Sequence, residues 1–174
     1  YWYSYLTYDF ASCITYAEKW VNLFEVSALD NKRRAAFLKG LNRLLQSAFR
    51  ANDRACFDQY YERLMHFDQV EGPALASNTD LLLTKYRAIQ LLNHVFLHAN
   101  FEDSLEAVEA CLEAVESNIG FMDKHTLLII YYKAAIYFFA LNDYDKALNL
   151  INRVIDEPGN LRSDLKGFAR IVRL

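Results

Sequence analysis

The stretch YYKAAIYFFALNDYDKALNLINRVIDEPGN, residues 131–160, carries the clearest structural pattern in this chain. It contains an apolar helix, a short Asn-Asp turn and a second helix with apolar residues at helical spacing. Asp143 is placed to cap the second helix, and Pro158 and Gly159 mark its end. One face of that helix is apolar, and its members are Tyr144, Ala147, Leu148, Ile151, Val154 and Ile155. The stretch therefore predicts a helical hairpin.

Similar turns followed by amphipathic helices occur three more times, at residues 8–10, 51–53 and 100–102. We expect a small residue one turn into each second helix, because paired helices approach closely only where little protrudes between their backbones. These residues are Cys13, Cys56, Ser104 and Ala147, separated by 43, 48 and 43 residues. The longer middle interval coincides with a loop that contains Gly72 and Pro73. The near-constant period predicts a repeated hairpin.

The turn NDYDKA, residues 142–147, resembles the inter-helix turn of a tetratricopeptide repeat. Tyr131, Ala135 and Phe138 stand where that family prefers an aromatic, a small and an aromatic residue. Ala147, Ile151 and Pro158 fall at or within a residue of its small, large apolar and terminating positions. The period of about 43 residues is longer than the 34 usual in this family. The resemblance implies a right-handed superhelix with a concave, ligand-binding face.

We therefore predict an all-α chain, an α-solenoid of antiparallel helical hairpins that forms a single domain over residues 1–174. The expected hairpins span about 1–29, 30–67, 79–118 and 123–158, and a further helix starts at 163–174 with Ser163 as its cap. Without an initiator Met or a signal peptide, the sequence is expected to be a piece of a longer protein.

Composition narrows the class of protein. Five Gly and two Pro are too few for a strand-rich fold, which needs frequent turns. A net charge of −3 disfavours a general nucleic-acid binder, and the many aromatic residues recur as core residues do. The most apolar stretch, residues 127–141, is too short to cross a membrane. Three widely spaced Cys suggest no disulfide framework and favour the cytoplasm.

Charge is unevenly distributed, and two stripes stand out. On a helical wheel, Lys32, Lys39, Arg43 and Arg50 fall within about 40° of one another. An acidic stripe consists of Glu102, Glu106, Glu109, Glu113 and Glu116. Each stripe is either a solvated helix face or a recognition surface, and the basic one could receive an acidic peptide or a carboxylate terminus.

The tetratricopeptide resemblance also implies which residues face the groove. They are Leu38, Leu41 and Leu45 in the second hairpin, Tyr86, Ile89, Asn93 and Phe96 in the third, and Tyr132, Ile136 and Phe139 in the last. Such a groove either binds an amphipathic helix or is filled by neighbouring helices. The candidate partner-binding residues are therefore Lys32, Lys39, Arg43, Arg50, Tyr86, Asn93, Tyr132 and Phe139.

Nothing in the sequence matches a common catalytic motif, so we expect no catalytic residue and no cofactor. His94 and His98 lie four residues apart on an expected helix and could place two imidazoles on one metal ion. Without a Glu at metalloprotease spacing or a nearby Cys, they are expected to be ordinary polar residues, and no metal site is expected.

The sequence thus predicts a non-catalytic protein-protein interaction or scaffold module that binds a peptide or partner helix on its concave face. One alternative is a ligand-sensing regulatory domain of a larger signalling or transcription-regulating protein. Another is an enzyme or metal protein built around His94 and His98.

Overall fold

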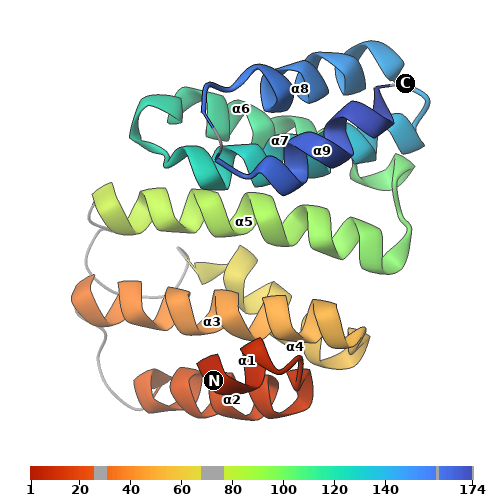
Figure 1. Cartoon of the computed structure of the whole chain (residues 1–174). Helices are drawn as coiled ribbons and strands as arrows, with labels where there is room; N and C mark the ends of the chain where they lie inside the picture. Colours follow the sequence, from red (N-terminus) through yellow and green to blue (C-terminus); the bar gives the residue numbers. More distant parts are fainter. Residues whose placement is uncertain (26–30, 68–76, 160, 174) are drawn as a thin grey trace. The chain divides into compact units, whose positions relative to one another are not determined.

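The computed structural model describes residues 1–25, 31–67, 77–159 and 161–173 (Figure 1). These residues form helices joined by turns, and there is no strand among them, so the predicted all-α class is confirmed for them. The chain divides into two compact units, Tyr1–His98 and Ala99–Leu174. The division falls inside the expected hairpin 79–118, and each unit is described by itself. The expected loop around Gly72 and Pro73 lies outside the described residues.

The first unit contains α1 (Trp2–Leu6), α2 (Phe10–Glu25), α3 (Asn31–Ala51), α4 (Arg54–Met65) and α5 (Ser77–His98). The second contains the 3-10 helix η2 (Glu102–Ser104), α6 (Leu105–Ser117), the 3-10 helix η3 (Ile119–Phe121), α7 (Lys124–Ala140), α8 (Tyr144–Asp156) and α9 (Ser163–Val172). None of the described helices is long and apolar enough to cross a membrane.

Three of the inter-helix turns share one local structure, because each has a left-handed residue followed by Asp. The left-handed residues are Tyr8, Asn52 and Asn142, with φ of 60°, 54° and 61°. Each following Asp donates its backbone N–H to the carbonyl five residues earlier, as in a Schellman motif. These bonds join Asp9 to Ser4, Asp53 to Ala48 and Asp143 to Phe138, at 2.8 to 2.9 Å.

The same three Asp residues cap the second helices. Each Oδ1 accepts a hydrogen bond from the N–H three residues on, at Ser12, Cys56 and Lys146, over 3.0 to 3.1 Å. Such a cap satisfies a backbone donor that the first turn of a helix leaves without a partner. The predicted capping by Asp143 is confirmed, and α8 ends at Asp156, just before Pro158.

The turn after α5 departs from this pattern. Ala99 is left-handed, with φ of 56°, but Asn100 follows it where the other turns have Asp. The chain then enters η2, and Ser104 Oγ donates to the Asn100 carbonyl oxygen at 2.7 Å. Asn100 Oδ1 is buried without a hydrogen-bond partner among the described residues. The Asx cap of the other turns is therefore not repeated here.

These turns correct the expected register of the second hairpin. Counting four residues on from the capping Asp reaches Cys13 after Asp9 and Ala147 after Asp143, and both are buried. From Asp53 the same step reaches Phe57, which is fully buried, whereas Cys56 is only partly buried. The small position predicted at Cys56 is therefore wrong by one residue, and a large ring fills it.

The core of the first unit is formed by the facing sides of its helices. In the helix packing, α3 contacts α2, α4 and α5, and Leu38, Leu41 and Leu45 are fully buried among them. These are positions that the family register assigned to a groove, and neighbouring helices fill them. Gly40 brings α3 close to α2, because a Cβ there would lie 2.9 Å from Trp20 Cδ1.

In the second unit, α7 packs against α8, and α9 packs against both of them. Lys166 of α9 donates to the carbonyl oxygens of Glu157 and Gly159, beyond the C-terminal end of α8. Arg87 of α5 contacts the carbonyls of Leu64 and Met65 at the end of α4 in the same way. A cation in this position satisfies helix carbonyls and matches the helix dipole. Ser163 is the first residue of α9, and its expected capping role is wrong because Arg162 holds the cap position without a side-chain bond.

Candidate functional site

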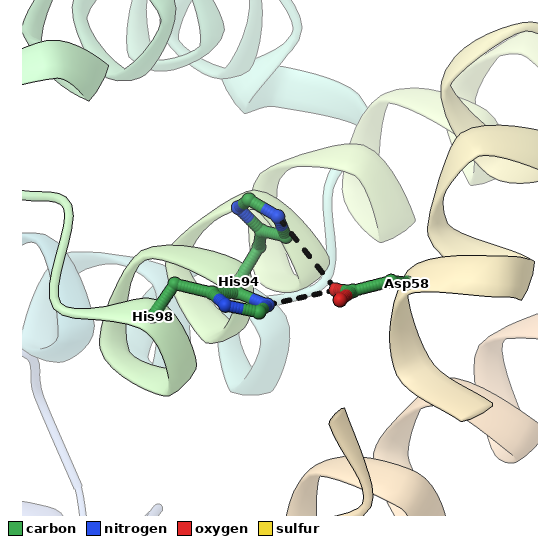
Figure 2. A group of neighbouring side chains, drawn as sticks. All are labelled: Asp58, His94 and His98. Atoms are coloured by element: carbon green, nitrogen blue, oxygen red, sulfur yellow. Dashed lines mark hydrogen bonds and ion pairs between the residues drawn. The ribbon is translucent and has the colours of Figure 1, made fainter. Parts of the chain in front are cut away.

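Asp58, His94 and His98 form a cluster of polar side chains in the first unit. Figure 2 shows both imidazoles on one helix, α5, and the carboxylate on its neighbour, α4. His98 Nε2 lies 2.7 Å from Asp58 Oδ1, and His94 Nε2 lies 3.9 Å from the same oxygen. The two imidazoles come together because residues four apart on a helix lie on one face.

Aromatic packing holds His94 in place. Its ring stacks on Tyr61 with centroids 4.3 Å apart and planes 12° apart, and the His98 ring centroid lies 4.6 Å away. Burial and the neighbouring His98 lower the pKa of His94, while the charges of Asp58 and Glu62 act in the opposite direction. The lowered pKa of His94 favours the neutral imidazole, whose lone pair can bind a metal ion.

The cluster has the composition of a metal site. One ligand atom from each side chain lies within 4.8 Å of the others, and both His side chains are about three-quarters buried. Two imidazoles and a carboxylate are donors that transition metals accept. The sequence identified the His pair but missed Asp58, which is 36 residues from His94 and on another helix. No local spacing could have revealed it.

Two residues of the basic stripe predicted on α3 contact aromatic side chains of this chain. The Arg43 guanidinium lies 4.5 Å from the Trp2 ring centroid, and Arg50 lies 4.7 Å from that of Tyr5. Lys39 is exposed, and the side chain of Lys32 falls outside the described residues. Arg43 and Arg50 thus pack on aromatic rings of α1, and binding of an acidic peptide by the stripe stays a prediction.

Asn93, predicted to face a partner, is instead buried between α3 and α5. It is 2% exposed and donates to Gln90 Oε1 at 2.8 Å, while Gln90 donates to Asn42 Oδ1 at 2.7 Å. Buried amides are stable when they bond to one another in this way. Tyr86, also on α5, is partly buried against the core of the first unit. Asn93 is thus not accessible to a partner in this structure.

The two candidate residues on α7 differ in exposure. Tyr132 is partly buried, whereas Phe139 is 50% exposed and meets the Tyr144 ring edge to face at 5.5 Å. Phe139 also lines an apolar recess of about 200 Å³ with Ala147 and Val172.

A larger groove lies in the second unit, between α6 and α8, with a volume of about 550 Å³. Its apolar lining residues are Leu112, Phe138 and Leu150, and its polar ones are Glu109, Glu113, Asp145, Lys146 and Asn149. The sequence pattern identified Glu109 and Glu113 as part of an acidic stripe. It did not indicate that α8 packs beside them.

Ion pairs neutralise one part of the acidic stripe. Lys146 Nζ lies 2.6 Å from Glu109 Oε1, and the hydrogen bond with Glu109 raises the pKa of Lys146. Arg153 forms an ion pair with Glu116, and its hydrogen bond holds the pKa of the Glu116 carboxyl below its usual range. Glu113 and Asp145 have no cation within ion-pair distance among the described residues. The groove therefore keeps two free carboxylates beside its apolar lining.

Comparison of the chain with known protein families, with curated proteins and with solved structures found no match.

Proposed function

We propose that this chain is a non-catalytic peptide-binding module of the tetratricopeptide type. The observation that carries the proposal is the groove between α6 and α8, with its apolar lining and its free carboxylates at Glu113 and Asp145. A volume of about 550 Å³ lies within the range of pockets that take small ligands or a few side chains. These features support a binding surface on the acidic stripe of α6 and on α8. This surface differs from the face of first helices, α3 among them, that the tetratricopeptide resemblance implies.

Repetition of one hairpin design supports the family assignment. Three turns use a left-handed residue and a capping Asp. In both units, a cation from the following helix covers the carbonyl end of the second helix of a hairpin. Repeat proteins build their binding surfaces from such stacked units, each burying its apolar face on the next.

Charge complementarity selects the occupant of the groove. The occupant is a peptide segment with a basic residue next to a large apolar one. The apolar side chain packs on Leu112 and Leu150, and the basic groups meet Glu113 and Asp145. Lys146 does not repel such a peptide strongly, because Glu109 and Asp143 already neutralise it.

The test uses three fluorescently labelled peptides of equal length, with repeating Lys-Leu, Glu-Leu and Lys-Ser composition. The Lys-Leu peptide is expected to bind, the Glu-Leu peptide to be repelled, and the Lys-Ser peptide to bind weakly because it buries no apolar surface. Raising the salt concentration should weaken binding of the Lys-Leu peptide. Fluorescence anisotropy reports all three affinities.

A charge-matched pair of variants locates the site. Glu113→Lys with Asp145→Lys reverses the two free carboxylates of the groove and should weaken Lys-Leu binding by tenfold or more, about 1.4 kcal/mol. Asp103→Lys with Glu106→Lys changes the net charge equally, but both positions are exposed and outside the groove. Equal loss in both pairs, or binding of all three peptides alike, would reject the proposed groove.

A further inference from the structure

Asp58, His94 and His98 lie far from the residues of the peptide groove in sequence and belong to the other unit, so their role is independent of the proposed function. His94 Nε2 and His98 Nε2 both approach one carboxylate oxygen, Asp58 Oδ1 (Figure 2). We infer that these three side chains form a binding site for a divalent transition-metal ion, Zn²⁺ in particular, that joins α4 to α5.

The distances are close to those that a zinc ion requires. Ligand atoms bound to zinc at about 2.0 Å in a tetrahedral arrangement lie about 3.3 Å from one another. Here the two His nitrogens lie 2.7 and 3.9 Å from Asp58 Oδ1. One contact is shorter than the required spacing and the other longer, and one ligand atom from each of the three side chains lies within 4.8 Å of the others.

The protonation chemistry of the cluster also suits a metal. His98 Nε2 lies 2.7 Å from Asp58 Oδ1, and in this hydrogen bond its N–H donates to the carboxylate. A zinc ion bound at Nε2 would displace that proton, which would move to Nδ1, so that the ring stays neutral. The carboxylate then binds the ion with the charge it already has. The three ligands leave the remaining position to water, as in zinc sites with three protein ligands.

The surroundings favour a positive ion at this position. Glu62 lies one turn along α4 from Asp58, and its charge acts on His94. The Tyr61 ring stacks on His94 and fixes one ligand before the metal arrives, which lowers the entropy cost of ordering the site. Imidazole nitrogens select zinc, nickel and copper over Mg²⁺ and Ca²⁺, which prefer oxygen ligands.

The test measures binding of Zn²⁺ alone to the chain by calorimetry, with Mg²⁺ as the comparison ion. We expect one Zn²⁺ per chain, no saturable Mg²⁺ binding, and a Tm that rises by several degrees when Zn²⁺ saturates the site. Co²⁺ provides a spectroscopic probe. Its spectrum should show nitrogen and oxygen ligands without the charge-transfer band of a thiolate, which separates this site from binding at Cys13, Cys56 or Cys111.

Two variants assign the ligands. Asp58→Asn keeps the shape of a half-exposed side chain, and His98→Ala removes one imidazole. Each should weaken Zn²⁺ binding by about tenfold or more, since even outer partners of metal ligands contribute 10- to 100-fold. The control is His125→Ala, because that His is exposed on α7 and outside the cluster. Far-UV circular dichroism verifies that each variant is folded.

Any of the following results overturns the inference. These are the lack of saturable Zn²⁺ binding, an unchanged affinity in folded Asp58→Asn, and a thiolate band in the Co²⁺ spectrum. Loss of affinity in His125→Ala equal to that in His98→Ala would also overturn it. None of these results bears on the peptide groove, because the two experiments use different probes and different variants.

Discussion

The guanidinium of Arg43 lies 4.5 Å from the centre of the Trp2 ring. This contact attaches α1 to the side of α3 that carries the basic stripe. A hydrogen bond between Tyr1 Oη and Ser47 Oγ, at 3.2 Å, acts in the same place. Cation-π contacts at partly exposed positions contribute about 0.5 to 1 kcal/mol. Part of the basic stripe therefore has a structural role.

The Arg43–Trp2 contact can be measured by a double-mutant cycle. Arg43→Met keeps an unbranched apolar stem without the charge, and Trp2→Leu removes the aromatic ring. We expect a coupling free energy of about 0.5 to 1 kcal/mol between the two changes in urea unfolding. Lys39→Met, an exposed position on the same helix, should change stability by less than about 0.5 kcal/mol. Zero coupling between Arg43 and Trp2 would show that the contact adds nothing to stability.

The register of the second hairpin is tested by two adjacent substitutions. Phe57 is fully buried and lies near the rings of Tyr61 and His94, so Phe57→Ala should destabilise the fold by about 3 to 5 kcal/mol. Cys56 is only partly buried, and Cys56→Ala should cost less than about 1 kcal/mol. Urea denaturation gives both values. The reverse order would restore Cys56 to the contact between the helices.

The effect of a glycine substitution on the stability of the fold depends on the backbone conformation at the substituted residue. Ala99 has φ of 56°, a conformation that costs residues with a Cβ about 1 kcal/mol or more. We expect Ala99→Gly to raise the free energy of unfolding by about 0.5 to 1 kcal/mol. The same change at Ala110, exposed in the middle of α6, should lower it by about 1 kcal/mol. Chemical denaturation of both variants should therefore give opposite signs.

The Glu116–Arg153 pair makes stability depend on pH in the acid range. Hydrogen bonds from Arg153 and Tyr131 lower the pKa of Glu116 in the folded state. The resulting stabilisation is complete above the unfolded pKa of about 4.3 and is lost as pH falls through the folded pKa. Glu116→Gln should therefore be less stable than the unchanged chain at pH 7, and the difference should shrink below about pH 4.

Thermal unfolding between pH 3 and pH 7 measures this dependence. Glu106→Gln is the control, since Glu106 lies on the same helix without an ion-pair partner among the described residues. A constant difference between Glu116→Gln and the unchanged chain across this range would show that the pair does not stabilise the fold.

Local signals in the sequence predicted the helices well. The expected hairpin over 123–158 corresponds to α7 and α8, and Asp143 caps the second helix as its position indicated. Helix periodicity, capping and turn residues act within a few positions along the chain, so they can be recognised without the fold. The wrong assignment of Cys56 arose because a small residue in the sequence does not locate a helix contact to within one residue.

The candidate sites depended much more on packing. Asn93 was predicted to face a partner because a helix pattern indicates the direction of a side chain but not what packs against it. In the structure, Asn93 bonds to Gln90 inside the first unit. Glu109 and Glu113 were recognised as a stripe, but the groove exists because α8 stands beside them. The helices that pack beside a charged or polar face determine whether that face is neutralised, buried or exposed.

The sequence by itself determined that this chain is helical, where its hairpins turn, and that His94 and His98 share one face of α5. Only the tertiary structure decided that Asp58 of α4 joins them, with its Oδ1 2.7 Å from His98 Nε2. The physical reason is that helix geometry relates residues three or four positions apart, whereas side chains 36 or 40 residues apart meet only through packing of the helices that carry them.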